Sequence, residues 1–159
     1  VERVGDSDKT GTSITFMPDS QIFETLDFSN ETIARRLREL SYLNSGIKII
    51  FADERDGSCS EFFAEGGIKS YVKYLNKAKT LIFDEPVYIF GSSQIAGTDK
   101  VIEVEMAFVY NDGYNESIMS YVNNIHTEEG GTHEFGFKSA YTKVFNGYVN
   151  KYNLLKDVN

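Results

Sequence analysis

The stretch NNIHTEEGGTH, residues 123–133, leads from a predicted strand through a polar loop into the longest predicted helix of the chain. Its paired glycines, Gly130 and Gly131, can adopt backbone angles that other residues avoid. Thr132 stands where a helix N-cap is expected, because its hydroxyl can accept a backbone N–H hydrogen bond. Glu134 falls in the first turn, where a carboxylate complements the helix dipole. The stretch therefore predicts a sharp, capped passage from strand to helix.

The spacing of apolar residues on either side of this stretch predicts the remaining elements. We expect helices at 30–43, with Ser29 as cap and Gly46 as stop, and at about 133–152. Gly66 and Gly67 open a further expected helix, in which Ile68, Tyr71, Val72 and Leu75 have helical spacing. We expect strands at 13–17, 47–52, 61–64, 87–90, 101–110 and 117–122, with a polar loop at 91–100. This order of elements indicates an α+β domain with a mixed or antiparallel sheet.

The last predicted helix carries a wide apolar stripe, formed by Phe137, Ala140, Tyr141, Val144, Phe145, Tyr148 and Val149. A stripe of this width is typical of a helix that buries one face against the rest of a domain. Such a helix commonly leads to a further strand, and none follows before Asn159. We therefore expect the chain to be truncated at its C-terminal end.

Length and composition limit the possible classes of protein. The chain has 159 residues, 41% of them hydrophobic, which suits one domain with a real core. No apolar run is long enough to cross a bilayer, and no export signal opens the chain. The single cysteine, Cys59, fits a reducing compartment. The net charge of −8 argues against a general basic surface for nucleic acid, so any such contact needs a local patch.

Few residues suggest catalysis by themselves. His126 and His133 are the only histidines, and no spacing in the chain matches a zinc site, so structural roles are favoured. No Gly-x-Ser-x-Gly elbow supports a Ser/His/Asp triad. The Gly11-Thr12 pair lacks the further glycines and the following lysine of a phosphate loop. The pairs Glu103/Glu105 and Glu128/Glu129 are interpreted as a solvated sheet face and a solvated loop.

Two basic regions remain as candidates for nucleic-acid contact. The run at 35–38 lies close to Glu31 and Glu39, so ion pairs within a helix explain most of it. The region 133–159 has a local positive balance, with lysines at 138, 143, 151 and 156 against Glu134 and Asp157. Lys138 and Lys143 lie off the apolar stripe and are the candidates for a phosphate-facing surface, with a plain solvated helix face as the alternative.

Several sequence blocks occur together and in a fixed order. They are KTGT (9–12) leading into FMPD (16–19), ARRLRELSYLNSG (34–46), EGGIK (65–69) with YLN (74–76), FVYNDGY (108–114) with VNNI (122–125), and EGGTH (129–133) followed by GFK (136–138). In these blocks the chain resembles the B subunit of bacterial DNA gyrase, a type II topoisomerase. The resemblance covers nearly the whole chain apart from the 91–100 loop. The B-type subunit of topoisomerase IV shares most of the blocks.

The resemblance implies a position within the gyrase polypeptide. Residues 1–18 correspond to the C-terminal end of a GHKL-type ATPase domain, and residues 19–159 to a truncated transducer domain. The implied transducer fold is a two-layer α+β sandwich, with a mostly antiparallel sheet of four to five strands and helices packed on one face, as in a ribosomal protein domain. Gly11 and Thr12 match a Gly-Thr element that borders the nucleotide pocket. The loop of Gly130, Gly131, Thr132 and His133 would present the following helix, on which Lys138 stands where the family has a DNA-facing basic residue.

The resemblance also implies a function for the parent protein. Such a subunit uses ATP and Mg²⁺, works on duplex DNA with the gyrase A subunit in an A₂B₂ complex, and forms a B-subunit homodimer on ATP binding, in the cytoplasm. The family's catalytic and magnesium-binding residues lie outside these 159 residues, so the resemblance implies no catalytic residue, no metal site and no ATP turnover in this chain alone. Two alternatives stay open: a non-catalytic middle domain of another GHKL protein, and a free-standing DNA-binding domain.

Overall fold

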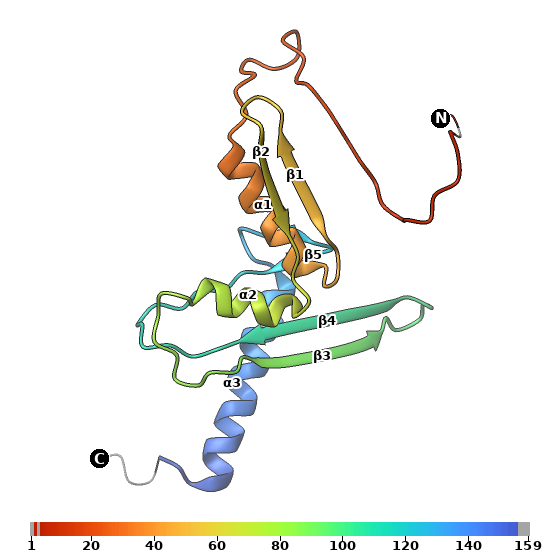
Figure 1. The fold of residues 1–159 in the computed structure, drawn as a ribbon. Helices are drawn as coiled ribbons and strands as arrows, with labels where there is room; N and C mark the ends of the chain where they lie inside the picture. The colour runs from red at the N-terminus through yellow and green to blue at the C-terminus, as the bar shows by residue number, and fades with distance from the viewer. Residues whose placement is uncertain (1, 3, 156–159) are drawn as a thin grey trace.

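The computed structural model describes residue 2 and residues 4–155 of the chain, and its elements follow one another as helix, hairpin, helix, two hairpins and helix (Figure 1). The helices are α1 (Asn30–Leu43), α2 (Gly67–Leu75) and α3 (Thr132–Tyr152). The strands are β1 (Ile49–Asp53), β2 (Ser58–Phe62), β3 (Val87–Gln94), β4 (Val101–Phe108), β5 (Tyr121–Val122) and β6 (Ile125–His126). The predicted α+β class is confirmed.

The first compact unit consists of α1 and the β1–β2 hairpin. The Ser29 hydroxyl accepts the backbone N–H of Thr32 at 3.2 Å, so α1 begins where the sequence predicts. α1 packs against both strands of the hairpin and against α2. Phe62 and Ala64, at the end of β2 and just after it, are the buried hydrophobic residues among those that the structure describes. The core of the described residues is therefore small and lies between the helices and this hairpin.

The predicted sheet of four to five strands is not formed within residues 4–155. The six strands pair as three separate two-stranded antiparallel sheets, β1–β2, β3–β4 and β5–β6. Each pair joins strands that are neighbours in sequence, where a short connection keeps the loss of loop-closure entropy small. The antiparallel pairing is confirmed, but the sequence pattern could not show that the hairpins would stay separate.

The β3–β4 hairpin is longer than the sequence pattern indicates. A polar loop was expected at 91–100, yet β3 continues through the polar residues Gly91–Gln94, and the turn between the strands is confined to 95–100. Gly91 pairs with Val104 and Gln94 with Val101, so backbone pairing with β4 extends the strand beyond its apolar residues. All eight residues of β3 are exposed, which explains why polar side chains are tolerated there.

Helix α3 departs from the expectation that its apolar stripe is buried. None of its residues is buried among the described residues, and Val144 is 73% exposed. Its first turns contact the chain through His133 and Glu134, and farther along Tyr141 meets Phe108 at the end of β4 with ring centroids 5.7 Å apart. The C-terminal part of the helix extends away from the other elements (Figure 1). The stripe is real, but the described residues do not cover it.

The segment before α1 is an extended trace without regular structure (Figure 1). The strand expected at 13–17 is not formed, because no described strand lies beside it to satisfy its backbone groups. The segment is attached near its end, where Arg55 donates to the Phe28 carbonyl at 2.6 Å and pairs with Asp27 at 3.2 Å. The rings of Phe16 and Phe23 contact Phe28 edge to face.

Candidate functional site

The loop at 123–126 contains a hairpin that the sequence pattern missed. Asn123 and Asn124 form the tight turn between β5 and β6, with φ of 49° and 66°. Asparagine is one of the few residues that adopt such left-handed angles, so the Asn-Asn pair was the available signal. The strand expected at 117–122 shrinks to Tyr121–Val122, because pairing begins only beside this turn. The turn brings Asn124 against α1.

The passage into α3 uses both glycines of the opening stretch. Gly130 has φ of 71° and Gly131 has φ of 154°, in regions that favour glycine. The predicted N-cap is wrong by one residue, because Gly131 takes the cap position and Thr132 becomes the first residue of the helix. The helix start has no side-chain cap bond, and the Gly131 carbonyl accepts the Phe135 N–H at 3.0 Å. The glycine backbone, and not a hydroxyl, sets the start of α3.

Side chains on both sides of this passage hold it together. His133 Nε2 lies 3.1 Å from Thr127 Oγ1 and so ties the start of α3 to the loop before it. Ser120 Oγ lies 2.7 Å from Thr127 Oγ1 and donates to Glu134 at 2.9 Å. Glu134 lies in the first turn, as predicted, and reaches Lys138 at 3.0 Å. The first two turns of α3 are therefore fixed to the β5–β6 hairpin by a set of polar contacts.

Lys138 has two acidic partners. Its Nζ lies 3.1 Å from Glu116 and 3.0 Å from Glu134, and the lysine side chain is 45% exposed. Hydrogen bonds to Glu134 and then Glu116 raise the pKa of Lys138, so the ammonium form is favoured. A hydrogen bond from Lys138, with a second from Ser120, lowers the pKa of Glu134. Lys138 is charged and reachable, but an anion would have to compete with these carboxylates.

A second polar cluster joins α1 and α2 to the β5–β6 hairpin, and the sequence analysis missed it. Glu39 accepts hydrogen bonds from Tyr121 and Arg36, and Tyr71 of α2 lies 3.5 Å from the same carboxylate. Arg36 also donates to the Asn124 carbonyl at 2.7 Å. The predicted ion pairing within the basic run is confirmed for Arg36 and Glu39. No sequence signal indicated that the same carboxylate would reach Tyr121, 82 residues away.

The electrostatics of this cluster favour an ionised Glu39. Burial acts to raise the pKa of Glu39, but hydrogen bonds from Tyr121 and Arg36 outweigh it and the pKa lies below its ordinary value of 4.5. Burial, followed by the hydrogen bond to Glu39, raises the pKa of Tyr121. The carboxylate therefore accepts and the tyrosine hydroxyl donates, which makes this a charge-assisted hydrogen bond.

The remaining candidates lie apart from this region. Lys143 is exposed on α3, while Lys156 and Asp157 fall outside the described residues. Gly11 and Thr12 lie in the exposed segment before α1, and nothing beyond the chain neighbours would stand within 4 Å of a Cβ at Gly11. The described residues therefore do not form a nucleotide pocket around Gly11 and Thr12.

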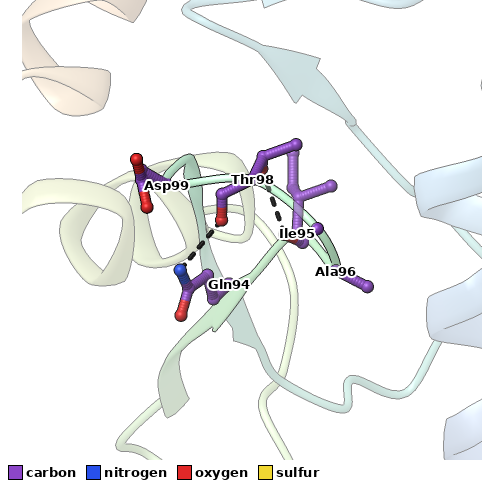
Figure 2. A pocket seen from close by; sticks show the side chains of 6 residues that line it. Gln94, Ile95, Ala96, Thr98 and Asp99 are labelled. Carbon is purple, nitrogen blue, oxygen red and sulfur yellow. Dashed lines mark hydrogen bonds between the residues drawn. The ribbon is translucent and has the colours of Figure 1, made fainter.

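Figure 2 shows a concavity at the tip of the β3–β4 hairpin, lined by residues 94–99. Gln94 donates to the Thr98 carbonyl at 2.8 Å, and the Thr98 hydroxyl donates to the Ile95 carbonyl at 3.0 Å. These polar groups satisfy one another and come from consecutive residues. The concavity is the inside of a turn and does not gather groups from different elements for a ligand.

The described part of the chain also lacks the features of a metal site. It holds no group of three or more histidine, cysteine or acidic side chains arranged to bind a metal ion. The ring of His126 packs on the ring of Tyr121, with centroids 5.1 Å apart. No helix within these residues has the length and apolar character to cross a membrane.

Comparison with known proteins identifies the family. A family model described as DNA gyrase B matches residues 67–159. The DNA gyrase B protein of Clostridium acetobutylicum is 51% identical over 98% of the chain. The chain belongs to the DNA gyrase B family. The gyrase B protein of Bacillus mycoides is likewise 51% identical, over 97% of the chain. These relatives carry the gyrase name, which favours gyrase over topoisomerase IV.

Solved structures of gyrase B share the fold. The 43K ATPase domain of Thermus thermophilus gyrase B, solved with an aminocoumarin, matches 89% of the chain with a TM-score of 0.72 and 39% identity. The gyrase B protein of Myxococcus xanthus matches 77% of the chain with a TM-score of 0.67 and 28% identity. The chain spans 24% of the length of the C. acetobutylicum gyrase B and 37% of the B. mycoides sequence, so it corresponds to one part of a gyrase B polypeptide.

Proposed function

We propose that this chain is the transducer portion of the ATP-hydrolysing B subunit of a DNA gyrase, and that it couples ATP binding and hydrolysis to DNA strand passage and negative supercoiling. The observation that carries the proposal is the 51% identity to a gyrase B protein over 98% of the chain. In this proposal residues 1–18 end the ATPase domain and residues 19–159 belong to the transducer domain. The extended segment before α1, held at Phe28 by Arg55, supports a boundary ahead of α1.

Helix α3 supplies the proposed DNA-facing surface. Within Thr132–Tyr152 it has three lysines and a single glutamate, although the whole chain carries a charge of −8. Lys138 and Lys143 are the proposed phosphate contacts, because lysine binds phosphate as a mobile point charge. A phosphate at Lys138 would replace the contacts to Glu116 and Glu134. The pair with Glu116 is an exposed ion pair that contributes little to stability, so its replacement costs little free energy. The Glu134 side chain is 19% exposed and would keep its hydrogen bond from Ser120.

The proposed cofactor and partners are those that the resemblance to gyrase B implies. The parent protein is proposed to use ATP and Mg²⁺, held by residues outside this chain, and ATP hydrolysis supplies the free energy of the cycle. Gly11 and Thr12 are proposed to border the nucleotide pocket. Its proposed partners are duplex DNA, the gyrase A subunit in an A₂B₂ complex, and a second B subunit on ATP binding. The proposed location is the cytoplasm. No catalytic step is assigned to residues of the described chain.

The test uses the full-length gyrase B protein that contains this chain, together with its A subunit and a relaxed plasmid. We expect ATP-dependent negative supercoiling, and no ATP turnover by the 159-residue chain alone. Replacing Lys138 and Lys143 by alanine should weaken DNA binding and reduce the slope of log affinity against log salt by about 1 for each phosphate that is no longer bound. Lys100→Ala, a change at an exposed lysine in the β3–β4 turn, serves as the control.

Three results would contradict parts of this proposal. Relaxation without supercoiling would indicate topoisomerase IV, and magnesium-dependent ATP turnover by the chain alone would show that the active site has been placed wrongly. Tight duplex binding by the chain alone, with a steep salt dependence, would instead favour a free-standing DNA-binding domain. A salt slope unchanged by the Lys138 and Lys143 replacements would remove α3 as the DNA-facing surface.

A further inference from the structure

The two polar clusters around the β5–β6 hairpin are joined through neighbouring residues of one strand segment. Tyr121 donates to Glu39 on α1, and Ser120, the preceding residue, donates to Glu134 on α3. Glu134 in turn holds Lys138. Two sets of side-chain contacts, joined by the Ser120–Tyr121 peptide bond, therefore run from α1, across the hairpin, to the lysine proposed to face DNA.

Glu39 is the point at which this series meets the first helix. Its side chain is 16% exposed, so removing it would leave its hydrogen-bond donors without their acceptor. Those donors come from three elements: Arg36 on α1 itself, Tyr71 on α2 and Tyr121 on β5. An ion pair within α1 would require only Arg36 as the partner of Glu39. The convergence of donors from separate elements indicates that the carboxylate fixes their relative positions.

The hairpin turn is held against α1 by further bonds beside Glu39. Arg36 donates to the Asn124 carbonyl at 2.7 Å while it pairs with Glu39. The Asn124 side chain donates to Asn44, just after α1, at 2.8 Å. The turn is thus anchored on both its backbone and its side chain. A displacement of α1 would be transmitted to the hairpin, because the contacts are short and directional.

We propose that Glu39 is a positioning residue that, by holding Tyr121 and Arg36, sets the place of the β5–β6 hairpin and thereby the orientation of Lys138 toward DNA. The inference rests on the proposed function and adds the route by which α1 and the DNA-facing helix sense one another. Coupling of this kind is reciprocal. DNA engagement at Lys138 is therefore expected to depend on the Glu39 contacts, although Glu39 touches no nucleic acid.

The test measures ATP turnover by the full-length gyrase B protein with its A subunit, as a function of linear duplex DNA concentration. Tyr121→Phe removes the hydroxyl that donates to Glu39 and keeps the aromatic ring. We expect the DNA concentration for half-maximal stimulation to rise about fivefold or more, with turnover in the absence of DNA unchanged. Tyr114→Phe is the matched control, because Tyr114 is fully exposed at 104%, and it should change neither quantity.

A second variant covers the case in which Tyr121→Phe does not fold. Ser120→Ala breaks the next link, the hydrogen bond to Glu134, without touching Glu39, and should raise the half-maximal DNA concentration in the same direction. Far-UV circular dichroism and the urea midpoint of each variant report whether folding is preserved. Normal DNA dependence in both folded variants, or in Ser120→Ala if it alone folds, would overturn the inference.

A double-mutant cycle decides whether the effect passes through Lys138. In a Lys138→Ala background, Tyr121→Phe should have no further effect on DNA dependence, whereas independent sites would give additive effects. Additivity would overturn the positioning role of Glu39. If Lys138→Ala alone left DNA dependence unchanged, the proposed DNA-facing surface itself would fail. A Lys138 effect combined with no effect of Tyr121→Phe would overturn only the inference about Glu39.

Discussion

Replacing Gly131 by alanine should open the joint between the β5–β6 hairpin and α3. Gly131 has φ of 154° and ψ of −174°, a combination that is essentially restricted to glycine. An added Cβ would stand 2.9 Å from His133 Cε1 and 3.0 Å from its Nδ1. The imidazole would have to move, and its contact with Thr127 would be weakened. The backbone strain and the steric contact with His133 both arise at Gly131, the N-cap of α3.

The magnitude follows from these two terms. Holding a residue other than glycine in this backbone region costs about 1–3 kcal/mol. A weakened exposed hydrogen bond from His133 adds at most about 1 kcal/mol. Together these give about 1–4 kcal/mol, and the middle of that range, about 2–3 kcal/mol, corresponds to roughly 30- to 150-fold more frequent opening of the joint. The same chemical change at Gly136, inside α3, meets nothing within 4 Å and should stabilise the helix by about 0.5–1 kcal/mol.

Hydrogen exchange of individual amides measures this opening. The Gly130 N–H, bonded to the Thr127 carbonyl at 2.9 Å, and the Phe135 N–H, bonded to the Gly131 carbonyl at 3.0 Å, report directly on the joint. Both should exchange faster in Gly131→Ala and no faster in Gly136→Ala. Equal exchange in the two variants would refute the argument from backbone angles, because the chemical change is the same in both.

Three further predictions concern the α1–hairpin unit. Ser29→Ala removes the cap of α1 and should cost about 1 kcal/mol in urea unfolding; an unchanged midpoint would show that the cap contributes nothing. Hydrogen bonds from Arg55 lower the pKa of Asp53 below its ordinary 3.8, so this stabilisation is complete above about pH 4 and is lost as pH falls through the lower folded-state pKa. The free energy of unfolding should therefore fall less steeply with acid in Asp53→Asn, and parallel curves would contradict this. Phe62→Ala, at a side chain 7% exposed, should cost about 3–5 kcal/mol, whereas Phe63→Ala, 55% exposed, should cost far less; equal losses would place the core elsewhere.

The sequence predicted best where local spacing and local chemistry agree. Helix α1 has the predicted bounds, since an apolar stripe, the Ser29 cap and the glycine after it all act within a few residues of one another. The end of α3 at Tyr152 was predicted from the spacing of its apolar residues. Prediction failed at Thr132, where a favourable cap residue was displaced by the glycine before it. A hydroxyl preference of about 1 kcal/mol is too small to decide between adjacent positions when the glycine backbone sets the turn.

Local sequence patterns were sufficient to predict the α+β class, the two long helices and the resemblance to gyrase B that the comparisons confirmed. Packing between distant elements places Lys138 between Glu116 and Glu134, and brings Glu39 to Tyr121 across 82 residues. It also decided that the hairpins stay separate and that the stripe of α3 lies open in the described residues. The reason is physical: periodicity and capping act over a turn or two of chain, whereas these contacts depend on how distant elements pack.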